Sequence, residues 1–146
     1  MKIIQSYVYF LILGFTGASL FGHCQVPCGI YDDASRVQQM LEDVSTISKA
    51  IDEIHVLNDK NDVQSNQQLI RWVNNKEIHA DKIIDTISNY FLTQRVKPSA
   101  EDYLQRLSDH HAVILLSMKA KQKADEKIAE ALKVAVEALS KYYHTH

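Results

Sequence analysis

The chain has 146 residues, of which 46% are hydrophobic, and its formal net charge is −2. This length fits one domain, and a charge near zero without a basic run argues against a nucleic-acid partner. Only 4 Gly and 2 Pro occur, and good helix formers dominate the sequence beyond its first segment. We therefore expect an all-α protein.

The first 22 residues differ in composition from the rest of the chain. Lys2 is their only charged residue, and residues 3–21 are mostly apolar or small. This pattern is typical of a cleaved signal peptide, and no basic cluster follows that would retain it in a membrane. We expect cleavage after Gly22 and export of residues 23–146, although a cut after Ser19 followed by trimming fits the small-residue rule better. The alternative is a propeptide that is removed in the cytoplasm.

Both cysteines lie in the next nine residues, 23–31, which read His-Cys-Gln-Val-Pro-Cys-Gly-Ile-Tyr. Cleavage before His23 would give it a free amine beside its imidazole. That amine, the Cys24 amide and the Cys24 thiolate form two chelate rings that share an edge, and a turn at Pro27 returns Cys28 as a fourth donor. The imidazole can reach the axial position. A planar set of two nitrogens and two sulfurs suits Ni(II) or Cu(II) better than tetrahedral zinc.

A Cys24–Cys28 disulfide is the alternative for an exported protein. The spacing differs from Cys-x-x-Cys and no βαβ pattern surrounds it, which argues against a thiol redox enzyme. Two functions without catalysis also stay open. One is an exported nickel- or copper-binding helical protein, and the other is a structural bundle closed by the disulfide.

Apolar residues recur at helical spacing in four later segments, which predicts four amphipathic helices. The first extends over residues 37–57, and the polar residues 58–66 separate it from the second. Ser65 with Gln68 has the form of a capping box for the second helix. That helix must end just before Pro98, because proline disfavours helix in the residue before it.

The third and fourth helices follow Pro98. Ser99 with Asp102 is expected to cap the third helix, and Asp125 the fourth. The apolar stripe that we assign to the core face of the third helix is Tyr103, Leu104, Leu107, His111, Ile114, Leu115 and Met118. The stripe of the fourth is Ile128, Leu132, Ala135, Val136, Leu139 and Tyr142. Four such helices with short polar connections predict an up-down-up-down four-helix bundle, preceded here by an N-terminal metal-binding hook.

Four histidines lie within the predicted helices, and we interpret His55, His79, His110 and His111 as packed or solvated side chains. A di-iron bundle needs Glu-x-x-His on two helices and two further glutamates. Only the pair formed by Asp52 and His55 resembles that motif.

Residues 23–31 fit the pattern His-Cys-x-x-Pro-Cys-Gly-x-Tyr, which resembles the nickel hook of the nickel superoxide dismutase family. The likeness extends over residues 23–146, most evidently at residues 71–81, at Tyr90 with Phe91 and at Pro98. The resemblance implies that superoxide is converted to dioxygen and hydrogen peroxide, with one nickel ion per subunit cycling between Ni(III) and Ni(II). It also implies a processing protease and a homohexamer of four-helix bundles.

The resemblance makes three residues the nickel ligands: His23 through its amine and imidazole, Cys24 through its amide and thiolate, and Cys28 through its thiolate. It places Tyr31 over the open face opposite the imidazole, where the hydroxyl orders water and limits access to small anions. Tyr90 is similar to a second tyrosine near that face.

Two positions depart from the family pattern. Gln38 stands where the family has a glutamate that steadies the axial imidazole, and His79 stands where it has a supporting arginine. We therefore expect different tuning of the axial ligand. Because the net charge is slightly negative, attraction of superoxide is assigned to Arg36 or Arg71.

Overall fold

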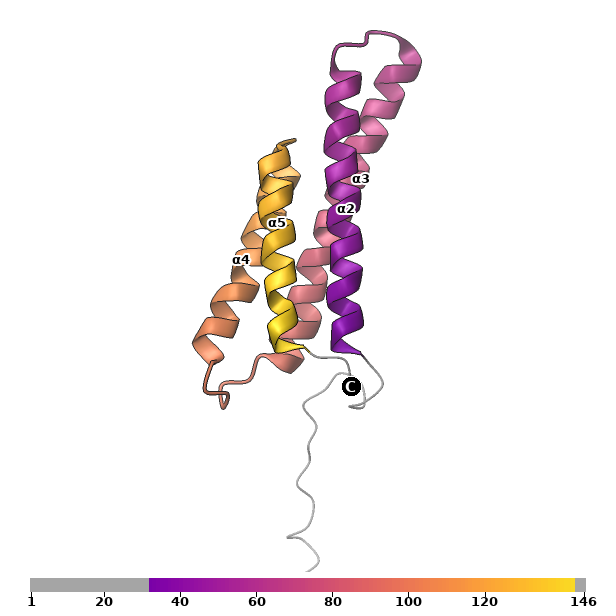
Figure 1. Ribbon diagram of the computed structural model, residues 1–146. Coiled ribbons are helices and arrows are strands. Elements are labelled where there is room, and N and C mark those ends of the chain that lie inside the picture. The colour runs from indigo at the N-terminus through magenta and orange to yellow at the C-terminus, as the bar shows by residue number, and fades with distance from the viewer. Residues whose placement is uncertain (1–31, 144–146) are drawn as a thin grey trace, which may run out of the picture.

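The computed structural model describes residues 32–143, and nearly all of them are helical (Figure 1). The elements are α2 (Asp33–Asn58), α3 (Val63–Asp85), the π-helix η1 (Thr86–Arg95), α4 (Tyr103–Gln122), α5 (Glu126–Leu139) and the 3₁₀ helix η2 (Ser140–Tyr142). Residues 1–31, which hold the predicted signal peptide and hook, lie outside the described part. No helix among the described residues is long and apolar enough to cross a membrane.

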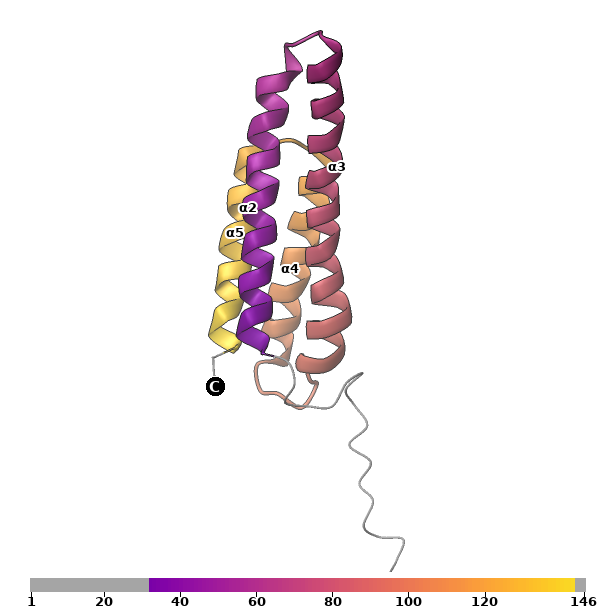
Figure 2. The same ribbon diagram turned by 90° about the vertical axis from the view of Figure 1, so that its right-hand side faces the viewer.

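The four long helices form an antiparallel bundle, which confirms the predicted architecture. Each helix contacts the next along the chain, and α5 returns to contact α2. The α2–α3 pair extends well beyond the turn between α4 and α5 (Figures 1 and 2). The opposite end, at the bottom of Figure 1, is where α2 and α4 begin and η1 and α5 end. We call it the lower end of the bundle.

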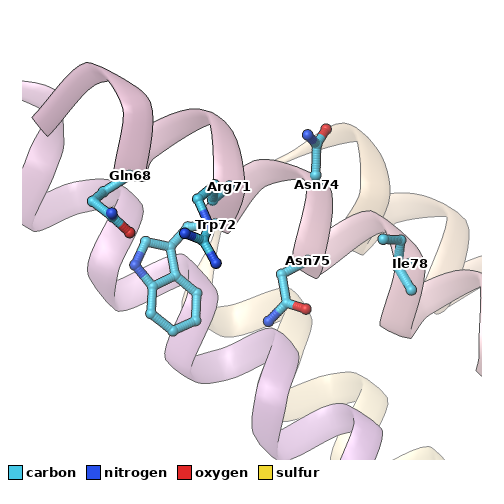
Figure 3. Close-up of a pocket in the computed structure, with 6 residues that line it drawn as sticks. All are labelled: Gln68, Arg71, Trp72, Asn74, Asn75 and Ile78. Carbon is cyan, nitrogen blue, oxygen red and sulfur yellow. The ribbon is translucent and has the colours of Figure 1, made fainter. Parts of the chain in front are cut away.

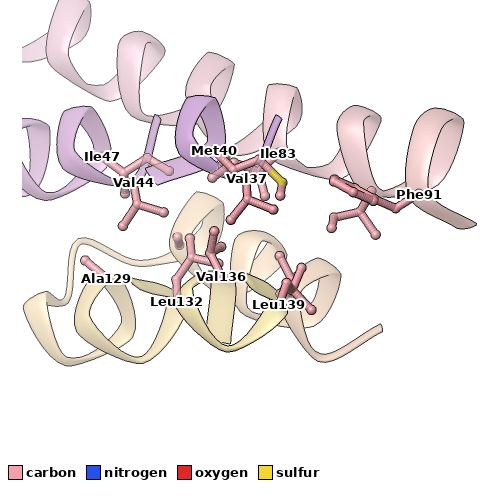
Figure 4. Close-up of a cluster of buried hydrophobic side chains, with 14 of the residues drawn as sticks. Val37, Met40, Val44, Ile47, Ile83, Phe91, Ala129, Leu132, Val136 and Leu139 are labelled. Carbon is pink, nitrogen blue, oxygen red and sulfur yellow. The ribbon is translucent and has the colours of Figure 1, made fainter. Parts of the chain in front are cut away.

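The core lies between all four helices and is built mostly from aliphatic side chains (Figure 4). The fully buried hydrophobic residues are Met40, Ile47, Ala50, Ile51, Ala80, Ile83, Ile87, Phe91, Val113, Ala120, Leu132, Val136 and Leu139. Burying a large side chain of this kind stabilises the fold by roughly 1.5–3 kcal/mol. Most of these residues belong to the predicted stripes of the first, second and fourth helices. Ala50 and Ala80 lie outside those stripes, and Val113 and Ala120 are added from α4.

The core face of α4 differs from the prediction. Its buried residues are His110, Val113, Ser117 and Ala120. In the predicted stripe, Leu104, Leu107, Leu115 and Met118 are instead 76%, 38%, 48% and 41% exposed, and His111 is exposed as well. The true face is displaced by one residue, which is a rotation of about 100°. The polar His110 side chain can face the interior because both of its ring nitrogens have hydrogen-bond partners.

The start of the second helix also differs from the predicted capping box of Ser65 and Gln68. Asp62 is the N-cap, and its carboxylate accepts a hydrogen bond from the Ser65 backbone N–H at 2.9 Å. The Ser65 hydroxyl donates to the other oxygen of the same carboxylate at 2.6 Å. Helix α3 therefore begins at Val63, before the predicted cap.

The predicted N-cap of the fourth helix is confirmed, whereas the third helix is capped at Asp102 and begins after the predicted cap, Ser99. Asp125 caps α5, with its carboxylate accepting from the Lys127 N–H at 2.9 Å. Asp102 holds the N-cap position of α4, but its carboxylate accepts from the Arg106 guanidinium at 2.7 Å instead of from a backbone N–H.

Candidate metal centre

The predicted nickel ligands His23, Cys24 and Cys28, together with Tyr31, lie outside the described residues. Within residues 32–143 no group of three or more His, Cys, Asp or Glu side chains is placed to hold a metal ion. The described bundle thus offers no competing site of this kind. The donor set of residues 23–28 fits nickel by its chemistry, since an amine, an amide and two thiolates match the planar preference of Ni(II).

The chain enters the bundle from this segment at the lower end. Asp32 caps α2, because its carboxylate accepts hydrogen bonds from the backbone N–H groups of Ala34 at 2.9 Å and Ser35 at 3.2 Å. Asp33, the first residue of α2, is five residues beyond Cys28. Five residues of chain span at most about 18 Å. This chain length sets the greatest distance that Cys28 can have from the start of α2.

Three of those side chains form one connected cluster, Asp33–Tyr90–Arg95. The Arg95 Nε donates to the Asp33 Oδ1 at 2.7 Å, and an Arg95 terminal nitrogen donates to the Tyr90 hydroxyl at 2.9 Å. The Tyr90 hydroxyl donates its own hydrogen to the same Asp33 oxygen. The guanidinium carbons of Arg95 and Arg36 lie 5.1 Å and 5.6 Å from the centre of the Tyr90 ring.

The cluster shifts the pKa values of two of its members. Burial and the hydrogen bond to Asp33 raise the pKa of Tyr90 above its usual value. Burial alone would lower the pKa of Arg95, but its hydrogen bonds to Tyr90 and Asp33 outweigh burial and raise that pKa. Tyr90 is therefore a neutral phenol at ordinary pH, and its hydroxyl hydrogen is held by a carboxylate.

The π-helical winding of η1 explains how Arg95 reaches Tyr90. In an α-helix, residues five apart differ by about 140° around the axis, so the two side chains would diverge. With hydrogen bonds from residue i to i+5 each turn holds more residues, so residues five apart come much closer to the same face of the helix. Two side chains follow the same winding: the Thr93 hydroxyl donates to the Ser88 carbonyl at 2.7 Å, and the Gln94 amide to the Asn89 carbonyl at 3.5 Å.

Sequence reasoning singled out Tyr90 but missed Asp33 and Arg95. It had no signal for Arg95, because helical periodicity of 3.6 residues places it on a different face from Tyr90. Asp33 could have been noticed as an acidic residue in the first turn of a helix, where it is favourable next to the N-terminal end of the helix dipole.

Gln38 and His79, which the resemblance matches to a glutamate and an arginine of the family, are not hydrogen-bonded to each other. Gln38 is exposed on α2. The His79 Nδ1 lies 2.6 Å from the Oδ1 of Asp43, which is largely buried. Asp43 is ten residues, or about 15 Å, along α2 from Asp33. Asp43 is a partner for His79 that the sequence reasoning did not find.

The two arginines that were assigned to superoxide attraction lie far apart. Arg36 is beside Tyr90 at the lower end. Arg71 is exposed and lies fourteen residues, or about 21 Å, along α3 from Asp85, the last residue of that helix. It lines an open surface pocket of about 330 Å³ together with Gln68, Trp72, Asn74, Asn75 and Ile78, all from α3 (Figure 3). Of these two arginines, only Arg36 lies beside Tyr90.

The interpretation of the helical histidines as packed or solvated agrees with their contacts. His110 is fully buried, donates from Nδ1 to the Arg106 carbonyl at 2.7 Å and accepts at Nε2 from the Tyr143 hydroxyl at 2.8 Å. The His55 Nε2 lies 3.0 Å from the Ala124 carbonyl oxygen.

Comparison with known proteins identifies the family of the chain and with it the reaction. The family described as nickel-containing superoxide dismutase matches residues 18–146, a range that includes the whole described bundle and the segment with both cysteines. No curated protein and no solved structure matches the chain. Because the family match covers far more than half of the sequence, the chain belongs to the nickel-containing superoxide dismutase family.

Proposed function

We propose that residues 23–31 form the nickel site of this superoxide dismutase, with one ion per subunit. The ligands would be the amine and imidazole of His23, the amide and thiolate of Cys24 and the thiolate of Cys28. The observation that carries the proposal is the family match across a segment whose four in-plane donors suit nickel. The position of that segment, a few residues before α2, supports a site at the lower end of the bundle.

When bound, nickel supplies reversible one-electron chemistry: one superoxide loses an electron and becomes dioxygen, and a second gains it and, with two protons, becomes hydrogen peroxide. Tyr31 would order water over the open face and limit access to small anions. Tyr90 is not a free proton donor, because its hydrogen is already donated to Asp33. Arg36 and Arg95 would attract the superoxide anion, with the Asp33 carboxylate offsetting one of the two positive charges.

A free amine on His23 requires processing of the chain. We infer that a protease removes residues 1–22 and that this segment is a signal peptide that directs export to the periplasm or the exterior. The single charge and apolar composition of residues 1–22 support export. Removal of a cytoplasmic propeptide would leave the chemistry at His23 the same.

Assembly into a homohexamer is the last part of the proposal. It is supported by the family resemblance and by the outward apolar face of α4, on which Leu104, Leu107, Leu115 and Met118 are 38–76% exposed. A row of exposed apolar residues of this kind is typical of an interface between subunits. Light scattering of the purified protein measures the assembly directly, and Leu107→Ser with Leu115→Ser should weaken it. A monomeric wild-type protein would contradict it.

The site proposal is tested on protein purified from its own cells, by N-terminal sequencing, intact mass, nickel content and dismutase activity of one sample. A chain that begins at His23, carries about one nickel per subunit and turns over superoxide is the expected result. Nickel or copper without turnover would instead indicate a binding protein, and a free-thiol count of zero would indicate the Cys24–Cys28 disulfide. A chain that keeps residues before His23 would refute the amine ligand.

A further inference from the structure

We propose that residues 140–143 form a latch on the lower end of the bundle, and that this latch opens when His110 takes up a proton. The latch consists of the 3₁₀ helix η2 and of Tyr143, which follows it. Every residue that carries this inference belongs to the described bundle, so the inference does not rest on the proposed nickel site. It gives the fold a local opening that responds to acid.

Two tyrosines hold the latch on α4. The Tyr143 hydroxyl donates to the Nε2 of His110 at 2.8 Å, and the Tyr142 hydroxyl donates to the Oδ2 of Asp109 at 2.7 Å. The Tyr143 ring also packs against the ring of Phe91, with 4.5 Å between the two centres. His110 and Phe91 are both fully buried. The closed latch is therefore in direct contact with two rings of the bundle interior.

The hydrogen bonds of His110 are compatible only with a neutral ring. Its Nδ1 donates to the Arg106 carbonyl at 2.7 Å, so Nε2 is left as the acceptor for the Tyr143 hydroxyl. A proton on Nε2 would remove that acceptor and place a charge on a fully buried ring. Burial accordingly lowers the pKa of His110 below its ordinary value of 6.5. Protonation becomes favourable once Tyr143 moves away and water reaches the ring.

The charged and titratable groups around His110 and Tyr143 come from four elements. They are Arg106 and Asp109 on α4, Lys141, Tyr142 and Tyr143 in the latch, Asp33 on α2 and Arg95 on η1. Hydrogen bonds from Lys141 and Tyr142 lower the pKa of Asp109, and burial raises the pKa of Tyr143. Asp109 therefore stays charged and Tyr143 stays neutral between about pH 5.5 and about pH 7.5. We assign the change of charge in this range to His110.

The size of the effect follows from the pKa of His110 in the open state. A hydrated ring takes the ordinary pKa of 6.5. With that pKa, protonation multiplies the population of the open state by about 11 at about pH 5.5, and by only about 1.1 at about pH 7.5. The ratio of open to closed latch should therefore rise by up to about tenfold between the two pH values.

Amide hydrogen exchange, measured by NMR at single residues, reports this opening. The Tyr143 amide donates to the Ser140 carbonyl at 3.2 Å in the closed latch, which protects it from exchange. After correction for the intrinsic rate at each pH, its protection factor should fall by about three- to tenfold from about pH 7.5 to about pH 5.5. In His110→Gln the same ratio should stay within about twofold. An equal pH dependence in the wild type and in His110→Gln would overturn the proposal.

Two comparisons separate the latch from other causes. His111→Gln removes the exposed histidine at the next residue, and the double variant His144→Gln/His146→Gln removes the two that follow the latch in the sequence. Both proteins should keep the pH dependence of the wild type, and its loss in either would overturn the role of His110. The amide of buried Val113 on α4 reports on unfolding of the whole bundle. Protection of Tyr143 as strong as that of Val113 would mean that the latch opens only when the bundle unfolds.

Tyr143→Phe tests the latch without touching the histidine. This variant keeps an aromatic ring against Phe91 and loses the hydroxyl that bonds to His110. The amide at position 143 should lose roughly two- to tenfold of its protection at about pH 7.5, because one hydrogen bond of the closed state is missing. Unchanged protection would show that this bond does not hold the segment, and would overturn the proposal.

Discussion

The buried histidine of α4 should make the stability of the bundle depend on pH. His110 is fully buried, and burial lowers its pKa below the ordinary value of 6.5, an effect that outweighs the opposing hydrogen bond to the Arg106 carbonyl and the charge of Asp109. Since that carbonyl can only accept, Nδ1 carries the hydrogen and Nε2 accepts from the Tyr143 hydroxyl. The ring is therefore neutral, and a proton added at Nε2 would face the hydrogen of Tyr143.

The sign of the effect follows from this lowered pKa. In the unfolded chain His110 has the ordinary pKa of 6.5, whereas its pKa in the folded protein is lower. The unfolded state thus holds more protons below about pH 6.5, and the free energy of unfolding decreases as the pH falls through that value. For a group that stays neutral when folded, the loss between about pH 7.5 and about pH 5.5 is at most about 1.4 kcal/mol. Above about pH 7.5 the contribution is constant.

Urea denaturation at the two pH values measures this loss. His110→Gln should reduce the pH dependence of the unfolding free energy by up to about 1.4 kcal/mol relative to the wild type. The comparison uses differences between pH values, so the packing defect of the substitution cancels. His111→Gln is the matched control, because it makes the same substitution at the next residue, whose side chain is exposed. An undiminished pH dependence in His110→Gln would refute the reasoning.

Three further predictions concern the stability of the bundle. Ser117→Ala should leave the melting temperature unchanged or raise it, because the buried Ser117 hydroxyl has no hydrogen-bond partner among the described residues; a clear decrease would indicate a missed partner. Lys76→Met should cost about 1–3 kcal/mol in urea denaturation, because the buried Lys76 amine donates to the Ala120 and Lys121 carbonyls at the end of α4. Lys121→Met, which removes only an exposed ion pair, should cost no more than about 1 kcal/mol. Asp125→Ala should cost about 1 kcal/mol by removing the N-cap of α5, and a melting temperature equal to that of the wild type would contradict the cap.

The bundle was predictable from the sequence because three of its four helices carry their apolar residues on the face that is buried. Helix α4 was the exception. Its most hydrophobic stripe, with Leu107 and Leu115, faces outward, while His110 and Ser117 face the core. Periodicity measures where apolar residues recur and cannot tell a core from an interface between subunits. Nor can it reveal that a distant tyrosine, Tyr143, satisfies a buried histidine.

The candidate site likewise has one part that the sequence predicts and another that it does not. The sequence predicts the nickel donors as one contiguous segment, in which the order of His23 and Cys24 on the backbone would determine the chelate rings, and this prediction concerns residues outside the described part. The Asp33–Tyr90–Arg95 cluster instead joins residues far apart in sequence, with Asp33 on α2 and Arg95 on η1, and the π-helical winding of η1 brings Arg95 toward Tyr90. A single residue more or fewer between positions 90 and 95 would separate the two side chains around the axis. A nine-residue motif is therefore enough to predict a ligand set, whereas the Asp33–Tyr90–Arg95 cluster depends on a local winding that no short motif encodes.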